Sequence, residues 1–425
     1  MSRKTMILAA LAAGISISSV AYAQEPVELR FMWYSDGNEG EVMADLLDRF
    51  QQENPDIKVV LDNVAYAVVR DQLPTQLEAG QGPDLARVTT LKDHAAHWLD
   101  LRDLVQDASY WEQNFGPYLD WMRPEGSDII PGYMTQLTVT GPFVNRTLFE
   151  QAGVELPGEG ATWDDWAAAV KKVAESQQVP IPLAMDRSGH RFAGPAVSMG
   201  AKFIGENGAP AVIDDGFKAM AERVARWHED GTMSPEIWGG VSGATYRGAN
   251  EEFANAEVVM YFSGSWQISQ FAETIGDAFD WAAVPNPCGP EACTGLPGGA
   301  GVVGIKYTQH PEQVARLMDW LASEPVLKEF YERTLFLPGH VGLTKAGLDY
   351  QSDNPSVKES LDTFVKEVGN LAPLANRLPA WQWANVSYAA IITRLGQVVA
   401  GEMSLEDAYQ RIQEDIDQQV AEAKR

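Results

Sequence analysis

One short loop concentrates side chains that are suited to binding chemistry. Arg187, His190 and Arg191 all lie in the segment 185–192, which is locally basic within an acidic chain. Arg87 ends a short apolar stretch, and Arg377 precedes a pair of tryptophans. Guanidinium forks match carboxylate, sulfonate and phosphate groups and also pairs of hydroxyls. These arginines therefore indicate a site for a polar or anionic ligand, with ion pairs to neighbouring acidic residues as the alternative.

Common catalytic and metal-binding patterns are missing from the sequence. The chain has no Gly-x-Ser-x-Gly, His-Glu-x-x-His or Gly-x-x-x-x-Gly-Lys-Ser/Thr motif. The glycines of 295–301 resemble a phosphate loop in composition but lack its lysine. Adjacent acids such as Asp164 and Asp165 stand where a helix is expected to begin, which favours a dipole partner over a glycosidase pair. Since the six histidines show no metal-ligand spacing either, we expect no catalytic residues, no metal and no cofactor.

The 13 tryptophans divide by their position in the sequence. Those on amphipathic patterns are expected to pack in the core: Trp98, Trp163, Trp166, Trp227 and Trp320. Four others lie in loop-like stretches: Trp238, Trp266, Trp381 and Trp383. An indole in a loop can stack on the apolar face of a ring-shaped ligand.

Charge and composition narrow the class of partner. The 425 residues include 32 Lys and Arg against 59 Asp and Glu, a net charge of −27. Such acidity argues against nucleic acid and against an anionic membrane surface as partners. The hydrophobic fraction of 45% is ordinary for a globular protein, and the length suggests about two to four domains or lobes.

The N-terminus predicts export. A basic start, an apolar stretch over 5–20 and the small-x-small sequence Ala21-Tyr22-Ala23 are typical of a signal peptide, here residues 1–23. A transmembrane anchor is the alternative, but the apolar stretch is short for a span of about 20 residues. No cysteine follows the cleavage site, so we expect a free periplasmic protein of a Gram-negative cell. In that oxidising compartment Cys288 and Cys293 are expected to form a local disulfide, with two free thiols as the alternative.

Hydrophobic periodicity predicts an α/β architecture. Residues 29–34 and 57–61 are expected to be strands and 41–53 a helix between them, which is a βαβ unit with parallel strands. Further helices are expected over 72–78, 163–177, 311–323 and 404–424, and further strands over 85–88 and 257–262. The Gly- and Pro-rich segment 285–301 is expected to cross between lobes.

Several short motifs follow one another in a fixed order along the chain. They are Leu46-Leu-Asp-Arg-Phe-Gln-Gln-Glu-Asn-Pro55, Gly80-Gln-Gly-Pro-Asp84, Thr140-Gly-Pro-Phe-Val-Asn145, Thr162-Trp-Asp164, Phe253-Ala-Asn-Ala-Glu-Val-Val-Met260, Gly264-Ser-Trp266 and Gly298-Gly299 followed by Pro311-Glu-x-x-Ala315. In this order they resemble the extracellular solute-binding proteins of carbohydrate ABC importers, of which maltose-binding protein is the best known. The resemblance covers essentially the whole mature chain. One departure is Phe143-Val144, where the family often has two tyrosines before the asparagine.

This resemblance implies a type II periplasmic-binding-protein fold. Two lobes, each a central sheet flanked by helices, would be joined by a multi-crossing hinge and would close around a sugar. The expected segments are 24–138 and 285–340 for the first lobe, and 139–284 and 341–425 for the second. The expected partners are a carbohydrate and the permease subunits of an ABC importer in the inner membrane, with the binding protein itself a monomer.

The resemblance and the loop positions together nominate the ligand contacts. Asp36 and Asn38 follow the first strand and are expected to bind hydroxyls, with turn formation as the alternative. Trp266 and one of Trp381 and Trp383 are expected to stack on sugar rings. The full set of expected contacts is Tyr34, Asp36, Asn38, Arg87, Thr90, Gln136, Arg187, His190, Arg191, Trp238, Trp266, Gly299, Arg377, Trp381 and Trp383.

The basic loop suggests that the sugar carries a negative charge. By its order along the family pattern, the loop 185–192 falls where maltose-binding relatives place an aromatic contact to the sugar. Because this loop is basic here, we expect an anionic sugar, preferably a uronide such as digalacturonate. A neutral sugar is the alternative if the arginines pair with acids such as Asp84 or Asp186. Two other function classes compete with transport: a secreted glycan hydrolase or lyase, and a binding protein that serves a chemoreceptor or takes a non-sugar solute.

Overall fold

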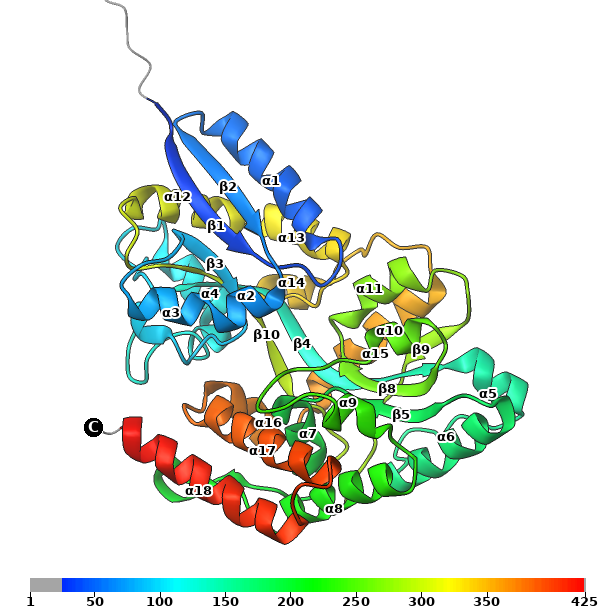
Figure 1. Cartoon of the computed structure of the whole chain (residues 1–425). Helices are drawn as coiled ribbons and strands as arrows, with labels where there is room; N and C mark the ends of the chain where they lie inside the picture. Colours follow the sequence, from blue (N-terminus) through cyan, green and yellow to red (C-terminus); the bar gives the residue numbers. More distant parts are fainter. Residues whose placement is uncertain (1–24, 424–425) are drawn as a thin grey trace, which may run out of the picture.

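The computed structural model describes residues 25–423 and shows two lobes connected by long strands (Figure 1). The predicted signal peptide, residues 1–23, falls outside these described residues. The first lobe, here the N-lobe, contains β1 (Val27–Trp33), α1 (Glu39–Glu53), β2 (Ile57–Asn63), α2 (Tyr66–Asp71), α3 (Leu73–Glu78), β3 (Leu85–Val88), a 3-10 turn (Ala95–His97), α4 (Ala108–Leu119), α12 (Pro311–Leu321), α13 (Glu324–Thr334) and α14 (Val341–Ala346).

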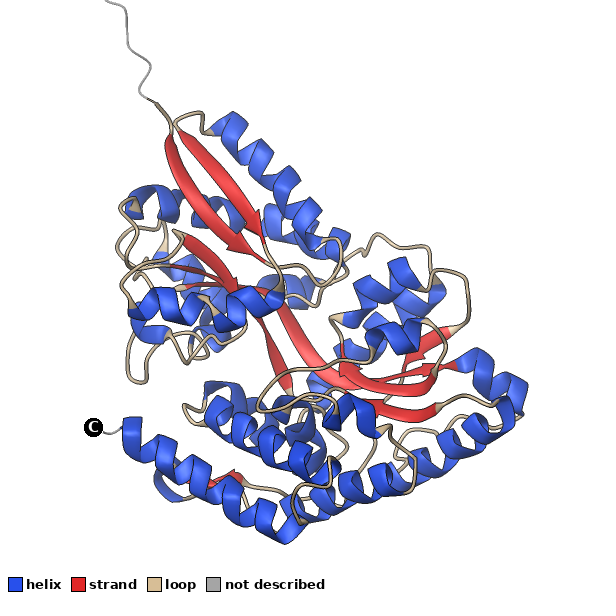
Figure 2. Cartoon of the chain, viewed as in Figure 1, coloured by secondary structure: helices blue, strands red, loops and turns tan. Residues whose placement is uncertain are grey.

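The second lobe, here the C-lobe, is larger and holds most of the helices (Figure 2). Its elements are α5 (Arg146–Ala152), α6 (Trp163–Gln177), β5 (Ile181–Met185), α7 (Gly189–Ser198), β6 (Phe203–Ile204), a 3-10 turn (Glu206–Gly208), β7 (Pro210–Ala211), α8 (Asp215–Glu229), α9 (Pro235–Gly239), α10 (Asn250–Ala254), β8 (Val258–Gly264), α11 (Gln267–Thr274), β9 (Trp281–Ala283), α15 (Pro355–Asn370), α16 (Pro373–Arg377), a 3-10 turn (Leu378–Ala380), α17 (Ala384–Val399) and α18 (Leu405–Ala423).

One mixed sheet runs through both lobes. Its strand order is β2-β1-β3-β10-β4-β8-β5, with β9 also beside β4. The strands β4 (Gly132–Asn145) and β10 (Pro297–Gly304) pass from lobe to lobe: β10 pairs with β3 at one end, and β4 pairs with β8 and β9 at the other. The pairing of β4 with β10 is irregular between Ala300 and Gly301, at the junction of the lobes. The expected two-lobed fold with a multi-strand connection is confirmed.

Local sequence patterns account for the elements that frame the site. The βαβ unit is confirmed, because β1 and β2 are parallel, with α1 between them. A capping box opens α6: Thr162 Oγ1 accepts from the Asp165 amide, and the Asp165 carboxylate accepts from the Thr162 amide. Cys288 and Cys293 form the expected disulfide. Within residues 25–423, no helix has the length and apolar character needed to cross a membrane.

Two expected lobe boundaries differ from the structure. The segment 285–296 stays with the C-lobe, since the Cys288 amide donates to Ala161 O and the Glu291 amide to Ser198 O. The crossing lies within β10 instead of at 285. On the other side, α14 stays in the N-lobe, where it packs against α4, so the last crossing follows residue 346 and not 340. The Gly- and Pro-rich composition of 285–296 marks a partly buried loop of the C-lobe, whereas the crossing itself is a hydrogen-bonded strand.

Candidate functional site

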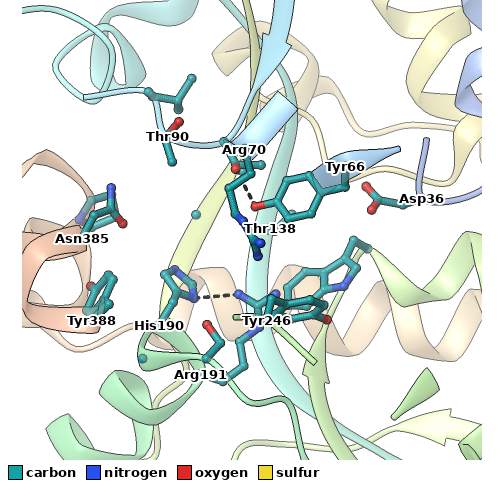
Figure 3. Close-up of a pocket in the computed structure, with 18 of the residues that line it drawn as sticks. Asp36, Tyr66, Arg70, Thr90, Thr138, His190, Arg191, Tyr246, Asn385 and Tyr388 are labelled. Atoms are coloured by element: carbon teal, nitrogen blue, oxygen red, sulfur yellow. Dashed lines mark hydrogen bonds between the residues drawn. The ribbon is translucent and has the colours of Figure 1, made fainter. Parts of the chain in front are cut away.

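A cavity of about 510 Å³ lies between the two lobes (Figure 3). The N-lobe lines it with the loop after β1, helix α2 and the loop after β3; the C-lobe lines it with the start of α7, the loop before α10, the turn between β8 and α11, and α17. Ligand sites in open α/β sheets lie beyond the carboxyl ends of strands, and β1, β3 and β8 end here. The volume falls in the range of about 300–1,000 Å³ that is typical of small-molecule sites.

Arg191, on the C-lobe wall, is held in place by an ion pair and an aromatic ring. Its Nε donates to the Asp186 carboxylate at 3.2 Å, and its guanidinium carbon lies 4.1 Å from the centroid of the Trp266 ring. Asp186 is fully buried and also accepts hydrogen bonds from Ser263 Oγ at 2.8 Å, from Tyr246 OH at 3.0 Å and from Tyr261 OH. A buried carboxylate with several donors is a rigid anchor, so the direction in which Arg191 points is set by the lobe itself.

His190 is neutral in this setting. Burial and the positive charge of Arg191 lower the pKa of His190 to about 3. Its Nε2–H therefore donates to the Pro297 carbonyl at 3.1 Å, and Nδ1 is left to accept from Arg191 Nη1 at 3.3 Å. The imidazole consequently orients Arg191 without adding a charge of its own to the cavity.

Arg187 is a buried cation held by backbone carbonyls alone. Its guanidinium donates to the carbonyl oxygens of Trp238, Thr245, Gly243 and Ile392 at 2.6–3.2 Å. No carboxylate among the described residues forms an ion pair with it, and burial lowers its pKa. Because an arginine stays protonated even so, the cavity wall carries a positive charge without a protein counter-ion.

Asp36, on the N-lobe wall, is the single acidic side chain of residues 25–423 that lines the cavity. Its carboxylate accepts a hydrogen bond from Arg87 Nη2 at 3.3 Å. Arg87 also donates to the carboxylate of Glu39 at 2.7 Å and to the side-chain oxygen of Gln136 at 3.0 Å. Removal from bulk water raises the pKa of Asp36 to about 6, and Arg87 opposes this shift only in part. Next to it, the Tyr34 and Tyr66 rings pack with centroids 5.0 Å apart, and Tyr66 OH pairs with Thr89 Oγ1.

The charge of the cavity lining is opposite to that of the chain. Among residues 25–423, the charged side chains of the lining are four cations, Arg70, Lys92, Arg187 and Arg191, and one acid, Asp36. Lys92 donates only to carbonyls, those of Asp120 and Arg123. In a chain of net charge −27 this local excess of positive charge singles the cavity out. No group of three or more His, Cys, Asp or Glu side chains in residues 25–423 is arranged to hold a metal ion.

Sequence comparison assigns the family. The family model for bacterial extracellular solute-binding proteins matches residues 34–328. The chain belongs to that family. A relative from Brucella abortus (strain 2308), described as a binding protein, is 23% identical over 397 residues, covering 88% of this solute-binding protein and 89% of the relative.

Solved structures similar to this solute-binding protein share its two-lobed fold. An ABC substrate-binding protein from Listeria monocytogenes in complex with cycloalternan superposes with a TM-score of 0.76 at 16% identity, covering 93% of this chain and 100% of that one. The maltose/maltodextrin-binding domain MalE from Bdellovibrio bacteriovorus bound to maltotriose gives a TM-score of 0.74 at 16% identity, with the same coverage. At such identities these structures establish the fold.

Most of the residues nominated from the sequence do meet in the cavity of this solute-binding protein. Those in its lining are Tyr34, Asp36, Thr90, Gln136, Arg187, His190, Arg191, Trp266 and Gly299. Arg87 lies behind that wall, fully buried, where it ties Tyr34, Asp36 and Gln136 together. It positions cavity residues and does not face the cavity.

The structure corrects the placement of five nominated residues. Asn38 turns away and donates to Arg333 O at 3.1 Å, and Trp238 is a core residue whose indole N–H donates to Met185 O. Trp381 is nearly buried and bonded to Gly208 O, Trp383 precedes the first turn of α17, and Arg377 is exposed at the end of α16. None of the five lines the cavity. The loop positions were identified, but the direction of each side chain depends on packing between distant segments.

Other lining residues were missed by sequence reasoning, namely Tyr66, Arg70, Lys92, Tyr246, Asn385 and Tyr388. Tyr66 and Arg70 had a usable signal, because they follow the second strand of a βαβ unit, whose carboxyl end must lie at the same sheet edge as that of the first. Asn385 lies two residues after Trp383 and Tyr246 seven residues before Phe253, so both are close to singled-out stretches, but nothing in those stretches indicates which neighbouring side chain faces the cavity.

Proposed function

We propose that this protein captures an acidic carbohydrate, a uronide such as digalacturonate, and delivers it to the permease of an ABC importer. The observation that carries the charge of the ligand is that two of the four cations in the cavity lining, Arg187 and Lys92, have no carboxylate partner among residues 25–423. The other two are paired, Arg70 with Asp71 and Arg191 with Asp186, and the one acid of the lining, Asp36, accepts from Arg87. Ion pairs in a cavity shielded from water are much stronger than on the surface, so an anionic ligand gains most from such a wall.

The family and the cavity aromatics support a carbohydrate. Solved relatives of this fold were captured with cycloalternan and with maltotriose. Here Tyr66, Tyr246, Trp266 and Tyr388 line the cavity with ring surface that can pack on sugar C–H faces. We also propose that the protein acts as a periplasmic monomer, with lobe closure around the sugar as the signal presented to the permease.

The same cavity gives little support to a hydrolase. Glycosidases of the common kind use two carboxyl groups that flank the scissile bond. Within the described residues only Asp36 supplies a carboxylate to the lining, and it is bonded to Arg87. The site therefore supports ligand binding without turnover better than it supports hydrolysis.

Isothermal titration calorimetry tests the proposal directly. The mature protein is titrated with digalacturonate and with the matched neutral disaccharide of galactose, and each mixture is then examined for cleavage products. We expect heat with digalacturonate, at least tenfold weaker affinity for the neutral disaccharide, and no product. Tight neutral binding without uronide heat would overturn the anionic ligand, product formation would overturn the transport role, and binding of neither sugar would overturn both ligand assignments.

A further inference from the structure

We propose that Arg70 and Arg191 form an anion clamp, in which one carboxylate of the ligand bridges the two lobes and makes closure depend on ligand charge. The clamp, meaning these two residues, rests on the proposed function, since it specifies how the acidic sugar is recognised. Arg70 lies on α2 of the N-lobe and Arg191 on α7 of the C-lobe. Figure 3 shows their side chains reaching into the cavity from opposite walls and pointing toward one another.

Each guanidinium is fixed along one edge by an acid of its own lobe. Arg70 Nε and Nη2 donate to the Asp71 carboxylate at 2.7 and 3.0 Å. Arg191 Nε donates to Asp186 at 3.2 Å, and its Nη1 to His190 Nδ1. A guanidinium has five N–H groups, so each arginine keeps donors in reserve. Neither Arg70 Nη1 nor Arg191 Nη2 has a hydrogen-bond partner among residues 25–423.

An aromatic ring of the same lobe lies beside each guanidinium, in close contact for Arg191 and at the outer limit of a cation–π contact for Arg70. The Arg191 guanidinium carbon lies 4.1 Å from the Trp266 centroid, and that of Arg70 lies 6.0 Å from the Tyr66 centroid. Stacking limits the rotation of a planar cation, which lowers the entropy lost when a ligand binds. The same construction therefore occurs twice, once on each wall, with the free edges toward the cavity.

Electrostatics explains why closure would need an anion. Asp71 and Asp186 offset part of the charge of Arg70 and Arg191, and the repulsion that remains between the two guanidinium groups grows as closure removes water from between them. Arg187 adds further positive charge without a counter-ion, and neutral His190 does not relieve it. A carboxylate has two oxygens and can accept from both arginines at once, which turns the repulsion into two charge-assisted hydrogen bonds. A neutral sugar cannot do this, so it is expected to bind without completing closure.

The experiment combines a variant of each wall with matched controls. Arg70→Gln and Arg191→Gln each remove one cation, and Arg70→Lys keeps the charge but not the fork. Arg226→Gln on α8 removes an exposed arginine paired with Asp164, and Arg49→Gln on α1 removes a half-buried arginine paired with Glu329; neither arginine lines the cavity. Affinities for digalacturonate and the neutral disaccharide are measured by calorimetry, closure by the radius of gyration in solution scattering, and folding by the thermal unfolding midpoint.

The clamp predicts a specific pattern of results. Digalacturonate affinity falls at least tenfold in Arg70→Gln and in Arg191→Gln, the double variant is little worse than either single one, and neutral affinity changes less than threefold. Digalacturonate compacts the wild type and both control variants but not Arg70→Gln. If the wild type binds digalacturonate and Arg70→Gln binds and compacts equally well, the clamp is wrong and the proposed function stands. If the wild type binds no acidic sugar, both are wrong.

Discussion

The guanidinium of Arg191 lies over the indole of Trp266, with its central carbon 4.1 Å from the ring centroid. A tryptophan that the sequence nominates as a sugar platform thus carries an arginine on one face. The ligand therefore meets a composite surface of cation and ring, and recognition of charge and of sugar shape is coupled through a single contact. Trp266 remains in the cavity lining, so part of its ring is still available.

Gly264 is required for that arrangement, because the Trp266 ring occupies the place of a side chain there. A Cβ added at Gly264 would lie 1.9 Å from Trp266 Cζ3. We expect Gly264→Ala to displace the indole and lower affinity about tenfold or more, measured by calorimetry, through loss of stacking. Gly369→Ala is the control, since a Cβ at Gly369 in α15 would meet nothing within 4 Å. Equal affinity in both variants would show that the position of Trp266 does not matter for binding.

Ligand affinity is expected to depend on pH through Asp36. The pKa of Asp36 is raised to about 6, so its carboxylate is charged above pH 6 and repels an acidic sugar. Below pH 6 the group is neutral, whereas the ligand carboxyl, with a pKa of about 3.5, stays ionised. Uronide affinity should therefore rise about threefold to tenfold as the pH falls from 7.5 to 5. Asp36→Asn should bind with the same affinity at both pH values; a slope retained in Asp36→Asn would assign the effect to another group.

A hydrogen bond across the mouth of the cavity is expected to favour the closed arrangement. Asn385 Nδ2 of the C-lobe donates to both oxygens of Asp93 of the N-lobe, at 3.0 and 2.9 Å. Hydrogen bonds to charged groups contribute about 1.5–3 kcal/mol when shielded and less when exposed. Asn385→Ala should thus raise the ligand dissociation rate about threefold to thirtyfold in stopped-flow tryptophan fluorescence, for acidic and neutral sugars alike. Asn376→Ala, an exposed change on α16, should leave the rate as it is.

Arg187 is expected to contribute more to stability than to ligand selection. Its guanidinium donates to four carbonyl oxygens, one on α9, two in the loop before α10 and one on α17, and Arg187 is 1% exposed. Arg187→Met would leave these acceptors without a donor, at a cost of about 3 kcal/mol or more in the free energy of unfolding. Urea denaturation measures this, with the exposed Arg226→Met as reference. A loss below about 1 kcal/mol would mean that water replaces the guanidinium.

Several features were predictable because they depend on neighbours along the chain. The apolar face of α1, the parallel pair β1 and β2, the capping box of Thr162 and Asp165 and the disulfide of Cys288 and Cys293 all follow from spacing over a few residues. The motifs in their order also indicated the family and its two-lobed fold, which the family match and the structure bear out.

The direction of individual loop side chains was not predictable in the same way. Trp238 and Trp381 come from stretches that resemble ligand loops, yet their indole N–H groups bond to carbonyls of residues 185 and 208, far away in sequence. Arg70 and Asn385 carry no motif at all, yet both line the cavity. Which face of a loop is buried depends on what the other lobe and the crossing strands place against it.

Spacing and composition along the chain indicated the fold class, the α/β character of the lobes, the basic segment around Arg191 and, separately, Trp266 as a candidate platform for a sugar ring. Contacts between distant segments establish the rest: Arg87 supports the wall from behind, Arg187 has no carboxylate partner within residues 25–423, Arg191 lies over Trp266, and Arg70 faces Arg191 across the cavity. Periodicity and capping depend on residues that are close together in the sequence. The cavity instead is formed by segments far apart in the sequence, which meet only because the sheet through β4 and β10 connects both lobes.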